Sequence, residues 1–131
     1  MKNLDLSDIR ILKELQKDAS SSIEEISELV SLSRNACWRR IRRLEEDGIL
    51  SKRVALVNAE ALNLGQMVIV LISTNSHDPN WLEQFRSAIA SMPEIMGAHR
   101  MSGDLDYILR VRVSDVKAYD KFYQKLIWKF I

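Results

Sequence analysis

The sequence contains few of the residues that build disulfides and metal sites. Cys37 is the single cysteine in 131 residues, so no internal disulfide and no cysteine-based zinc site can form. The two histidines, His77 and His99, are far apart, one in a polar turn and one in a strand-like run. We therefore expect no metal site and no bound cofactor.

Long apolar runs are also missing. The longest, Met67 to Ile72, has the length of a strand and is far short of the roughly 18 to 20 residues that a membrane-spanning helix needs. The N-terminal stretch MKNLDLSDIR has acidic residues where a signal peptide would place its apolar segment. These features predict a cytoplasmic protein.

Neither sign of charge dominates the chain, which has 19 Lys and Arg residues against 18 Asp and Glu. Within this nearly neutral sequence, five arginines fall in one ten-residue stretch: Arg34, Arg39, Arg40, Arg42 and Arg43. Such a local concentration of positive charge indicates that this segment meets a polyanion.

The first third of the chain predicts three short helices. The first begins near Asp5 or Ser7, with Asp5 and Asp8 as an acidic capping pair, and ends near Lys17. Ser22 and Glu25, three residues apart, form a capping box that opens the second helix.

The third helix is predicted from Ser33, its N-cap, to about Asp47, and Gly48 ends it. The tight turn between the second and third helices is typical of a helix-turn-helix. Ile49 to Val57 reads as one or two short strands, which would make the unit a winged helix-turn-helix.

The third helix has two distinct faces when it is projected at 100° per residue. Cys37, Ile41 and Leu44 share one face, which we expect to be buried, and Asn35, Arg39 and Arg42 lie opposite, flanked by Trp38 and Arg43. Arginine can bind guanine and asparagine can bind adenine in the DNA major groove, whereas other arginines neutralise phosphates.

We therefore predict a DNA-binding surface on this helix and the following segment. Residues expected near base edges are Arg34, Asn35, Trp38 and Arg39, and the capping Ser33 also belongs to the predicted DNA-binding residues. Residues expected near phosphates are Arg40, Arg42, Arg43, Lys52 and Arg53. Two alternatives remain: a solvated basic face paired with Glu45, Glu46 and Asp47, and a Trp38 that packs on a neighbouring helix.

The rest of the chain predicts the order β-α-β-β-α. Strands are expected over Met67 to Thr74, Ile95 to Met101 and Tyr107 to Val113, with a helix that opens at Asp78-Pro79 and ends at Met92-Pro93. Ser114-Asp115 opens a last helix, whose inner face is expected to hold Val116, Tyr119, Tyr123 and Leu126. A split β-α-β fold normally closes with a fourth strand, and none is expected here.

Four stretches follow one another along essentially the whole chain: LDLSDIRILKELQKD, SLSRNACWRRIRRLEEDGIL, MPEIMGAHRM and SGDLDY. In this order and spacing they resemble the Lrp/AsnC (leucine-responsive, feast/famine) transcriptional regulators. The resemblance implies an N-terminal winged helix-turn-helix that binds DNA. It also implies a C-terminal ferredoxin-like domain that dimerises, and amino acids bound where such domains meet.

In this family the turn that matches Gly103, Asp104, Asp106 and Tyr107 helps to form the effector site. Its backbone amides could face an amino acid's carboxylate, and Asp104 or Asp106 its ammonium group. The alternative is a simple acidic hairpin turn. Family members usually continue through a last strand and a tail, so the resemblance implies a truncated C-terminal domain.

The resulting expectation is an α+β chain with two domains: residues 1–64, a winged helix-turn-helix with a connecting strand, and residues 65–131, a ferredoxin-like βαββα(β) domain without its last strand. The expected function is sequence-specific transcriptional regulation in response to a small effector. The alternative is a ligand-binding or decoy subunit that pairs with full-length relatives. No nucleophile-base pair, metal-spaced cluster or phosphate loop indicates an enzyme.

Overall fold

The computed structural model of the chain describes residues 3–76 and 78–130, and the predicted turn at His77 lies outside them. The chain divides into two compact units, Met1–Leu56 and Val57–Ile131. The domain ranges predicted above, 1–64 and 65–131, stay a prediction.

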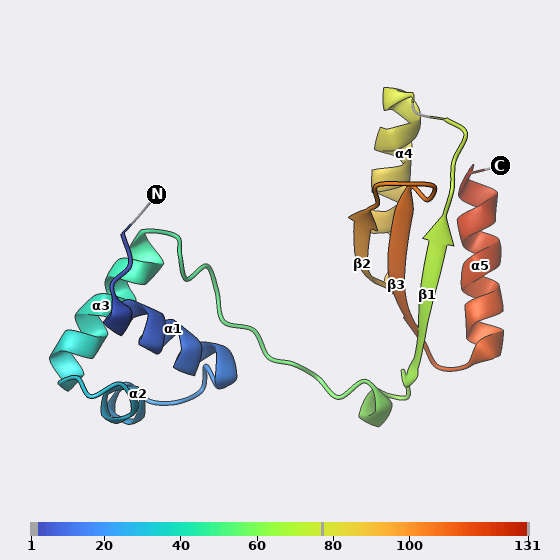
Figure 1. Cartoon of the computed structure of the whole chain (residues 1–131). Coiled ribbons are helices and arrows are strands. Elements are labelled where there is room, and N and C mark those ends of the chain that lie inside the picture. Colours follow the sequence, from blue (N-terminus) through green and yellow to red (C-terminus); the bar gives the residue numbers. More distant parts are fainter. Residues whose placement is uncertain (1–2, 77, 131) are drawn as a thin grey trace. The chain divides into compact units, whose positions relative to one another are not determined.

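The first unit consists of the three predicted helices, α1 (Leu6–Lys17), α2 (Ile23–Leu29) and α3 (Arg34–Glu46) (Figure 1). Their N-caps, Asp5, Ser22 and Ser33, each accept a hydrogen bond from a backbone N–H of the first turn. Gly48 follows α3 with φ +71°, the left-handed conformation that commonly ends helices and that glycine adopts without strain. The three predicted helices are confirmed.

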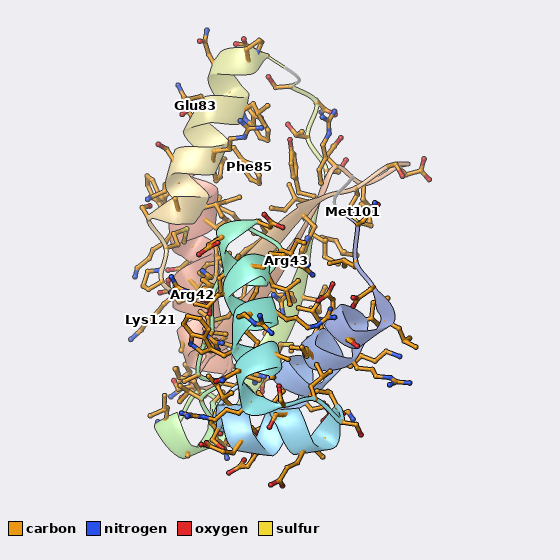
Figure 2. All side chains as sticks on the ribbon, turned by 90° about the vertical axis from the view of Figure 1, so that its left-hand side faces the viewer. Arg42, Arg43, Glu83, Phe85, Met101 and Lys121 are labelled. Carbon is orange, nitrogen blue, oxygen red and sulfur yellow. The ribbon has the colours of Figure 1, made fainter. Side chains whose placement is uncertain are left out.

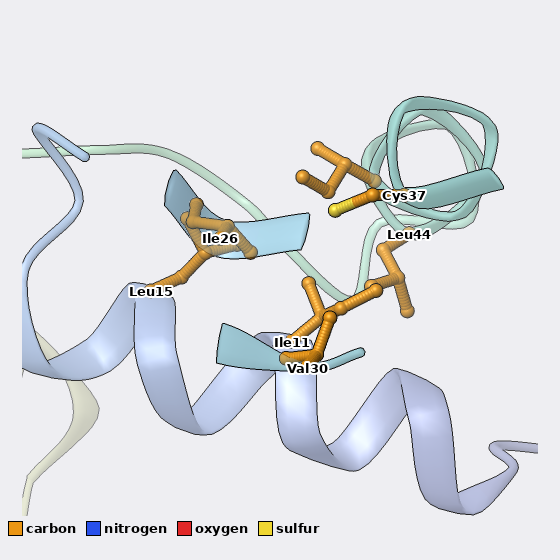
Figure 3. Close-up of a cluster of buried hydrophobic side chains, with 7 residues drawn as sticks. Ile11, Leu15, Ile26, Val30, Cys37 and Leu44 are labelled. Atoms are coloured by element: carbon orange, nitrogen blue, oxygen red, sulfur yellow. The ribbon is translucent and has the colours of Figure 1, made fainter. Parts of the chain in front are cut away.

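One core holds the three helices together (Figure 3). It consists of Ile11, Leu15, Ile26, Val30, Cys37, Ile41 and Leu44, with Leu12, Ile23, Leu32, Ile49 and Leu50 packed around it. All three helices contribute, so each is held by burial of one apolar face rather than by helix propensity alone. Cys37 is fully buried, as its position on the helix predicted.

The strands expected within Ile49–Val57 do not form, and that prediction is wrong. A strand needs a partner for its backbone N–H and C=O groups, and no described residue pairs with this segment. Residues 51–57 run as exposed chain with Lys52 and Arg53 at the surface. A β-rich composition therefore did not suffice to make a sheet here.

The second unit is α+β. It contains a short 3-10 turn (Glu60–Leu62), β1 (Gln66–Ile72), α4 (Pro79–Ala90), β2 (Ile95–Arg100), β3 (Tyr107–Val113) and α5 (Val116–Phe130). The described strands form one antiparallel sheet in the order β1-β3-β2. This matches the predicted β-α-β-β-α order, and Asp78 and Pro79 open α4 as expected.

The two helices cover one face of this sheet (Figure 1). The core contains Met92 near the end of α4, Leu109, Val111 and Val113 of β3, and Phe122 and Leu126 of α5. Part of the predicted inner face of α5 is wrong, since Val116 and Tyr123 are 65% and 47% exposed. Phe122, which the projection missed, is 1% exposed, because the sheet meets the helix on its Tyr119–Phe122–Leu126 side.

The opposite face of the sheet is uncovered within the unit. Met67, Ile69 and Leu71 of β1 are 45%, 49% and 55% exposed, and they alternate with Val68, Val70 and Ile72, which pack against the core. Alternate residues of a strand point to opposite faces, so the first three form an apolar stripe on the open face. We call Met67, Ile69 and Leu71 the open-face stripe.

Candidate nucleic-acid interface and effector turn

The position of α3 is set by local contacts at both of its ends. Ser33 Oγ accepts a hydrogen bond from the Ala36 N–H at 3.2 Å, and before it Ser31 adopts a left-handed backbone with φ 57°. The Leu32 N–H donates to the Ser27 carbonyl at 2.9 Å, which ties the turn to α2. These contacts fix the direction in which α3 leaves the turn.

The face of α3 opposite the core is exposed and carries the predicted base-reading side chains. They are Arg34, Asn35, Trp38 and Arg39, with Arg42 beside them. The Trp38 ring is 49% exposed, and the guanidinium carbon of Arg42 lies 5.7 Å from its centroid, a cation–π contact. Trp38 therefore packs only partly on its surroundings and keeps half of its surface available to a partner.

Three cations of the predicted surface form exposed ion pairs. Arg34 pairs with Glu24 at 3.0 Å, Arg42 with Glu46 at 3.6 Å and Arg53 with Glu45 at 3.0 Å. Exposed pairs of this kind contribute only about 0 to 1 kcal/mol, so a phosphate can replace the carboxylate at small cost. Arg39 and Lys52 have no ion pair with any described residue, which leaves both cations available.

Arg40 and Arg43 are arranged differently. Arg40 Nη1 donates to Asp5 Oδ2 at 2.6 Å and to Asp8 Oδ1 at 3.0 Å, and Arg43 Nη2 donates to Asp8 Oδ2 at 2.5 Å. Asp8 is fully buried, and the Arg40 side chain is only 28% exposed. Both arginines were expected to meet phosphate, but in the structure they bind the N-terminus of α1.

Asp5 and Asp8 also form a reciprocal capping box at the N-terminus of α1, in which each carboxylate accepts a hydrogen bond from the backbone N–H of the other residue. The Asp8 N–H donates to Asp5 Oδ1 at 2.9 Å, and the Asp5 N–H donates to Asp8 Oδ2 at 3.1 Å. Hydrogen bonding from Arg40 is the main reason why the pKa of Asp5 falls to about 2. The same pairing raises the pKa of Arg40, with Asp5 the larger contributor.

The sequence indicated the acidic cap, but not its contact with arginines 32 to 35 positions further along the chain. Figure 2 shows Arg42 and Arg43 on α3. Although they are neighbours in sequence, Arg42 lies over Trp38 and Arg43 contacts Asp8. One helix thus divides its arginines between an exposed face and a contact with α1.

The predicted effector turn connects β2 to β3. Gly103 has φ +115°, a conformation that other residues adopt only with strain, and Asp104 is exposed. Asp106 instead holds the turn in place: its Oδ2 accepts from the Thr74 N–H at 2.7 Å, and its own N–H donates to the Ile72 carbonyl at 2.9 Å. Asp106 is therefore engaged in holding the turn, whereas Asp104 is exposed to solvent.

Tyr107 starts β3 and belongs to an aromatic cluster. Its ring lies 4.6 Å from that of Phe85, which Figure 2 places on α4, and Phe85 stacks on Trp81 at 5.0 Å. Tyr107 also borders a hollow of about 340 Å³ between α4 and β2, whose rim includes Arg86 and Arg100. The ring thus has a packing role and also faces space that a small molecule could fill.

The described residues contain no group of three or more His, Cys, Asp and Glu side chains that could hold a metal ion. None of the helices that the structure describes is long and apolar enough to cross a membrane.

Both units match known families. Residues 4–51 match the winged helix-turn-helix DNA-binding family, and residues 67–130 match the Lrp/AsnC ligand binding domain. The DNA-binding transcriptional activator DecR of Escherichia coli (strain K12) is 43% identical over 124 residues, which are 95% of this chain and 82% of DecR. The chain belongs to the Lrp/AsnC family of transcriptional regulators.

Other Lrp/AsnC proteins agree with this assignment. The crystal structure of an AsnC family regulator from Agrobacterium tumefaciens has a TM-score of 0.91 and 43% identity, covering 96% of this chain and 82% of that one. A transcriptional regulator of Neisseria meningitidis in complex with L-Met has a TM-score of 0.88 and 31% identity, covering 96% and 81%. The predicted family, the α+β fold class and the prediction of a regulator rather than an enzyme are confirmed.

Proposed function

We propose that this Lrp/AsnC protein is a sequence-specific DNA-binding regulator that reads DNA with the exposed face of α3. The observation that carries the proposal is the set of exposed polar and cationic side chains opposite the Cys37–Ile41–Leu44 face: Asn35, Arg39 and Arg42. Arginine and asparagine are suited to the donor and acceptor pattern of the major groove. Lys52 and Arg53 add cations on the exposed segment that follows α3.

The salt dependence of DNA affinity tests this proposal. If about five phosphates are neutralised, the logarithm of affinity should fall with the logarithm of salt concentration with a slope of about −4.5. Fluorescence anisotropy with labelled duplex DNA over a salt series gives the slope. A slope near zero would contradict DNA binding by this surface.

We further propose that the small effector is an amino acid and that it binds at the turn between β2 and β3. Asp104, exposed on this turn, is the group available for an ammonium ion, and Gly103 brings backbone amides near a carboxylate. Asp106 and Tyr107 complete the predicted site, the first by holding the turn and the second by bordering the adjacent hollow. The L-Met complex of the Neisseria relative supports this class of ligand.

Calorimetric titration with a panel of amino acids tests the effector proposal. Asp104→Asn should weaken the binding of a responding amino acid about tenfold or more, because an ionic hydrogen bond contributes roughly 1.5 to 3 kcal/mol. Gln124→Glu, an exposed substitution on α5, is the control and should leave binding unchanged. Equal affinities of wild type and Asp104→Asn would exclude Asp104 as the ammonium partner.

Self-association and a cytoplasmic location complete the proposal. The open-face stripe supports association, because exposed apolar patches of this kind are commonly interaction sites. The alternative, a decoy subunit that pairs with full-length relatives, stays a prediction. Co-expression with a tagged full-length relative tests it, and the absence of mixed dimers would exclude it.

A further inference from the structure

We propose that Asp8 is a positioning residue for DNA binding: it holds Arg40 and Arg43 against α1, so that other cations carry the charge that faces DNA. The inference rests on the proposed DNA-binding function. It concerns a residue of α1 that lies outside the predicted DNA-contacting set. It also divides the arginine cluster of α3 into two groups with different roles.

The first argument is the burial of Asp8. The residue is 0% exposed, and a buried carboxylate is stable only with charged or hydrogen-bonding partners. Both of its oxygens are used: Oδ1 accepts from Arg40, and Oδ2 accepts from Arg43 and from the Asp5 N–H. An arginine that leaves this site for a phosphate would leave a buried charge with too few partners.

The second argument is the balance of charge. Asp5 and Asp8 face Arg40 and Arg43, so two negative and two positive groups form a closed neutral cluster. Arg40 bridges both carboxylates, at 2.6 Å and 3.0 Å. The cluster therefore offers no net positive charge to DNA, although half of the Arg43 side chain is exposed.

The third argument is the contrast with the remaining cations. Arg34, Arg42 and Arg53 have partners, but each of these pairs is partly or largely exposed. Arg39 and Lys52 have no ion pair among the described residues. Five cations are thus available and two are held, so the expected slope is about −4.5 per bound chain instead of about −6 for all seven.

The test compares single substitutions in the full chain, using anisotropy with a labelled mixed-sequence duplex over a salt series. Arg43→Gln should leave the slope unchanged, because Arg43 does not release counterions, whereas Arg39→Gln should make it shallower by about 0.9. Asp8→Asn should release Arg43, whose ion pair is with Asp8, and steepen the slope by about 0.9, whereas Arg40 keeps its pair with Asp5. Glu14→Gln, which removes one negative charge elsewhere on α1, is the matched control and should leave the slope unchanged.

A merely structural Asp8 would lower stability without steepening the slope, so a folded Asp8→Asn protein with the wild-type slope would overturn the proposal. An Arg43→Gln slope as shallow as that of Arg39→Gln would overturn it too. Circular dichroism shows whether Asp8→Asn folds. If it does not, the slopes of Arg43→Gln and Arg39→Gln decide the proposal, because Arg43→Gln leaves the Arg40–Asp8 contact in place. A wild-type slope near zero would instead contradict DNA binding itself.

Discussion

Single residues of the helix-turn-helix unit act through the conformation or the contact that each one supplies. Ser33 caps α3, Gly48 ends it, and Cys37 fills its buried side. Burial raises the pKa of the Cys37 thiol, which favours an unreactive, packed side chain. Asn35, in contrast, is exposed, which agrees with the proposed contact to DNA.

Gly48→Ala should destabilise the protein by about 1 kcal/mol, because alanine is strained at the φ of +71° that this position adopts. Open space surrounds the position, so a steric clash does not contribute. Gly48→Asn is the matched variant and should cost less, since asparagine tolerates the left-handed region. Urea unfolding measures both, and equal stabilities for all three proteins would contradict the role of Gly48 as a helix stop.

Asn35→Ala should reduce sequence discrimination rather than general affinity. A lost contact to a base edge is expected to cost about 1 to 3 kcal/mol on the preferred sequence, with little change on mixed-sequence DNA. Competition binding with a duplex selected from a randomised library measures the difference. Lys52→Gln is the contrasting variant, and it should weaken both duplexes alike; if Asn35→Ala did the same, a base-reading role for Asn35 would be excluded.

At the scale of elements, α1 and α3 are joined by charge as well as by the apolar core. The capping box at Asp5 and Asp8 could be predicted from spacing, because capping is a local property of four residues. The contact of these acids with Arg40 and Arg43 could not, since it joins residues more than thirty positions apart. The same limit explains the missing strands after α3, because a strand depends on a partner that local composition does not supply.

The contact between α1 and α3 predicts a pH dependence of stability. The pKa of Asp5 is lowered from its usual 3.8 to about 2 in the folded protein, so ionised Asp5 stabilises the fold above pH 3.8. This contribution is lost as the pH falls through that range toward about 2. Urea unfolding should show that wild type and Asp5→Asn differ in free energy of unfolding at neutral pH and that this difference disappears near pH 2.

Arg40→Gln provides the control for this experiment. The hydrogen bond from Arg40 is the largest cause of the lowered Asp5 pKa, so in the Arg40→Gln background the pH dependence of the Asp5→Asn effect should be much smaller. The same pH dependence with and without Arg40 would show that the pairing is not its origin.

For the whole molecule, the sheet of the second unit presents one covered and one open face. The faces follow from strand alternation, so the apolar character of β1 on both sides was visible in the sequence. The strand order β1-β3-β2 is a property of the tertiary structure. The packing of α4 and α5 on the same face of the sheet is another.

If the open-face stripe mediates the proposed self-association, Ile69→Asp should yield monomers, because it places a charge in the centre of the stripe. Light scattering measures the mass. Leu62→Asp replaces an exposed leucine, 59% accessible and outside the sheet, and should leave the mass unchanged. An unchanged mass for Ile69→Asp would show that this face is not the contact.

A dimer also predicts the form of its DNA site. Two-fold symmetry requires a roughly palindromic sequence with half-sites about one helical turn apart, or a multiple of it. Footprinting of the wild-type protein on a selected duplex tests this, and a single unpaired patch of protection would exclude a symmetric complex.

By itself, the sequence determined the family, the three N-terminal helices with their caps, and the order of the elements that follow. These depend on short-range patterns: capping pairs, the glycine after α3, and the spacing of apolar residues. Only the tertiary structure decided which arginines of α3 contact α1, which side of α5 is buried, and that Asp106 anchors its own turn. Each of these depends on contacts between residues far apart in the chain, and folding alone brings such residues together.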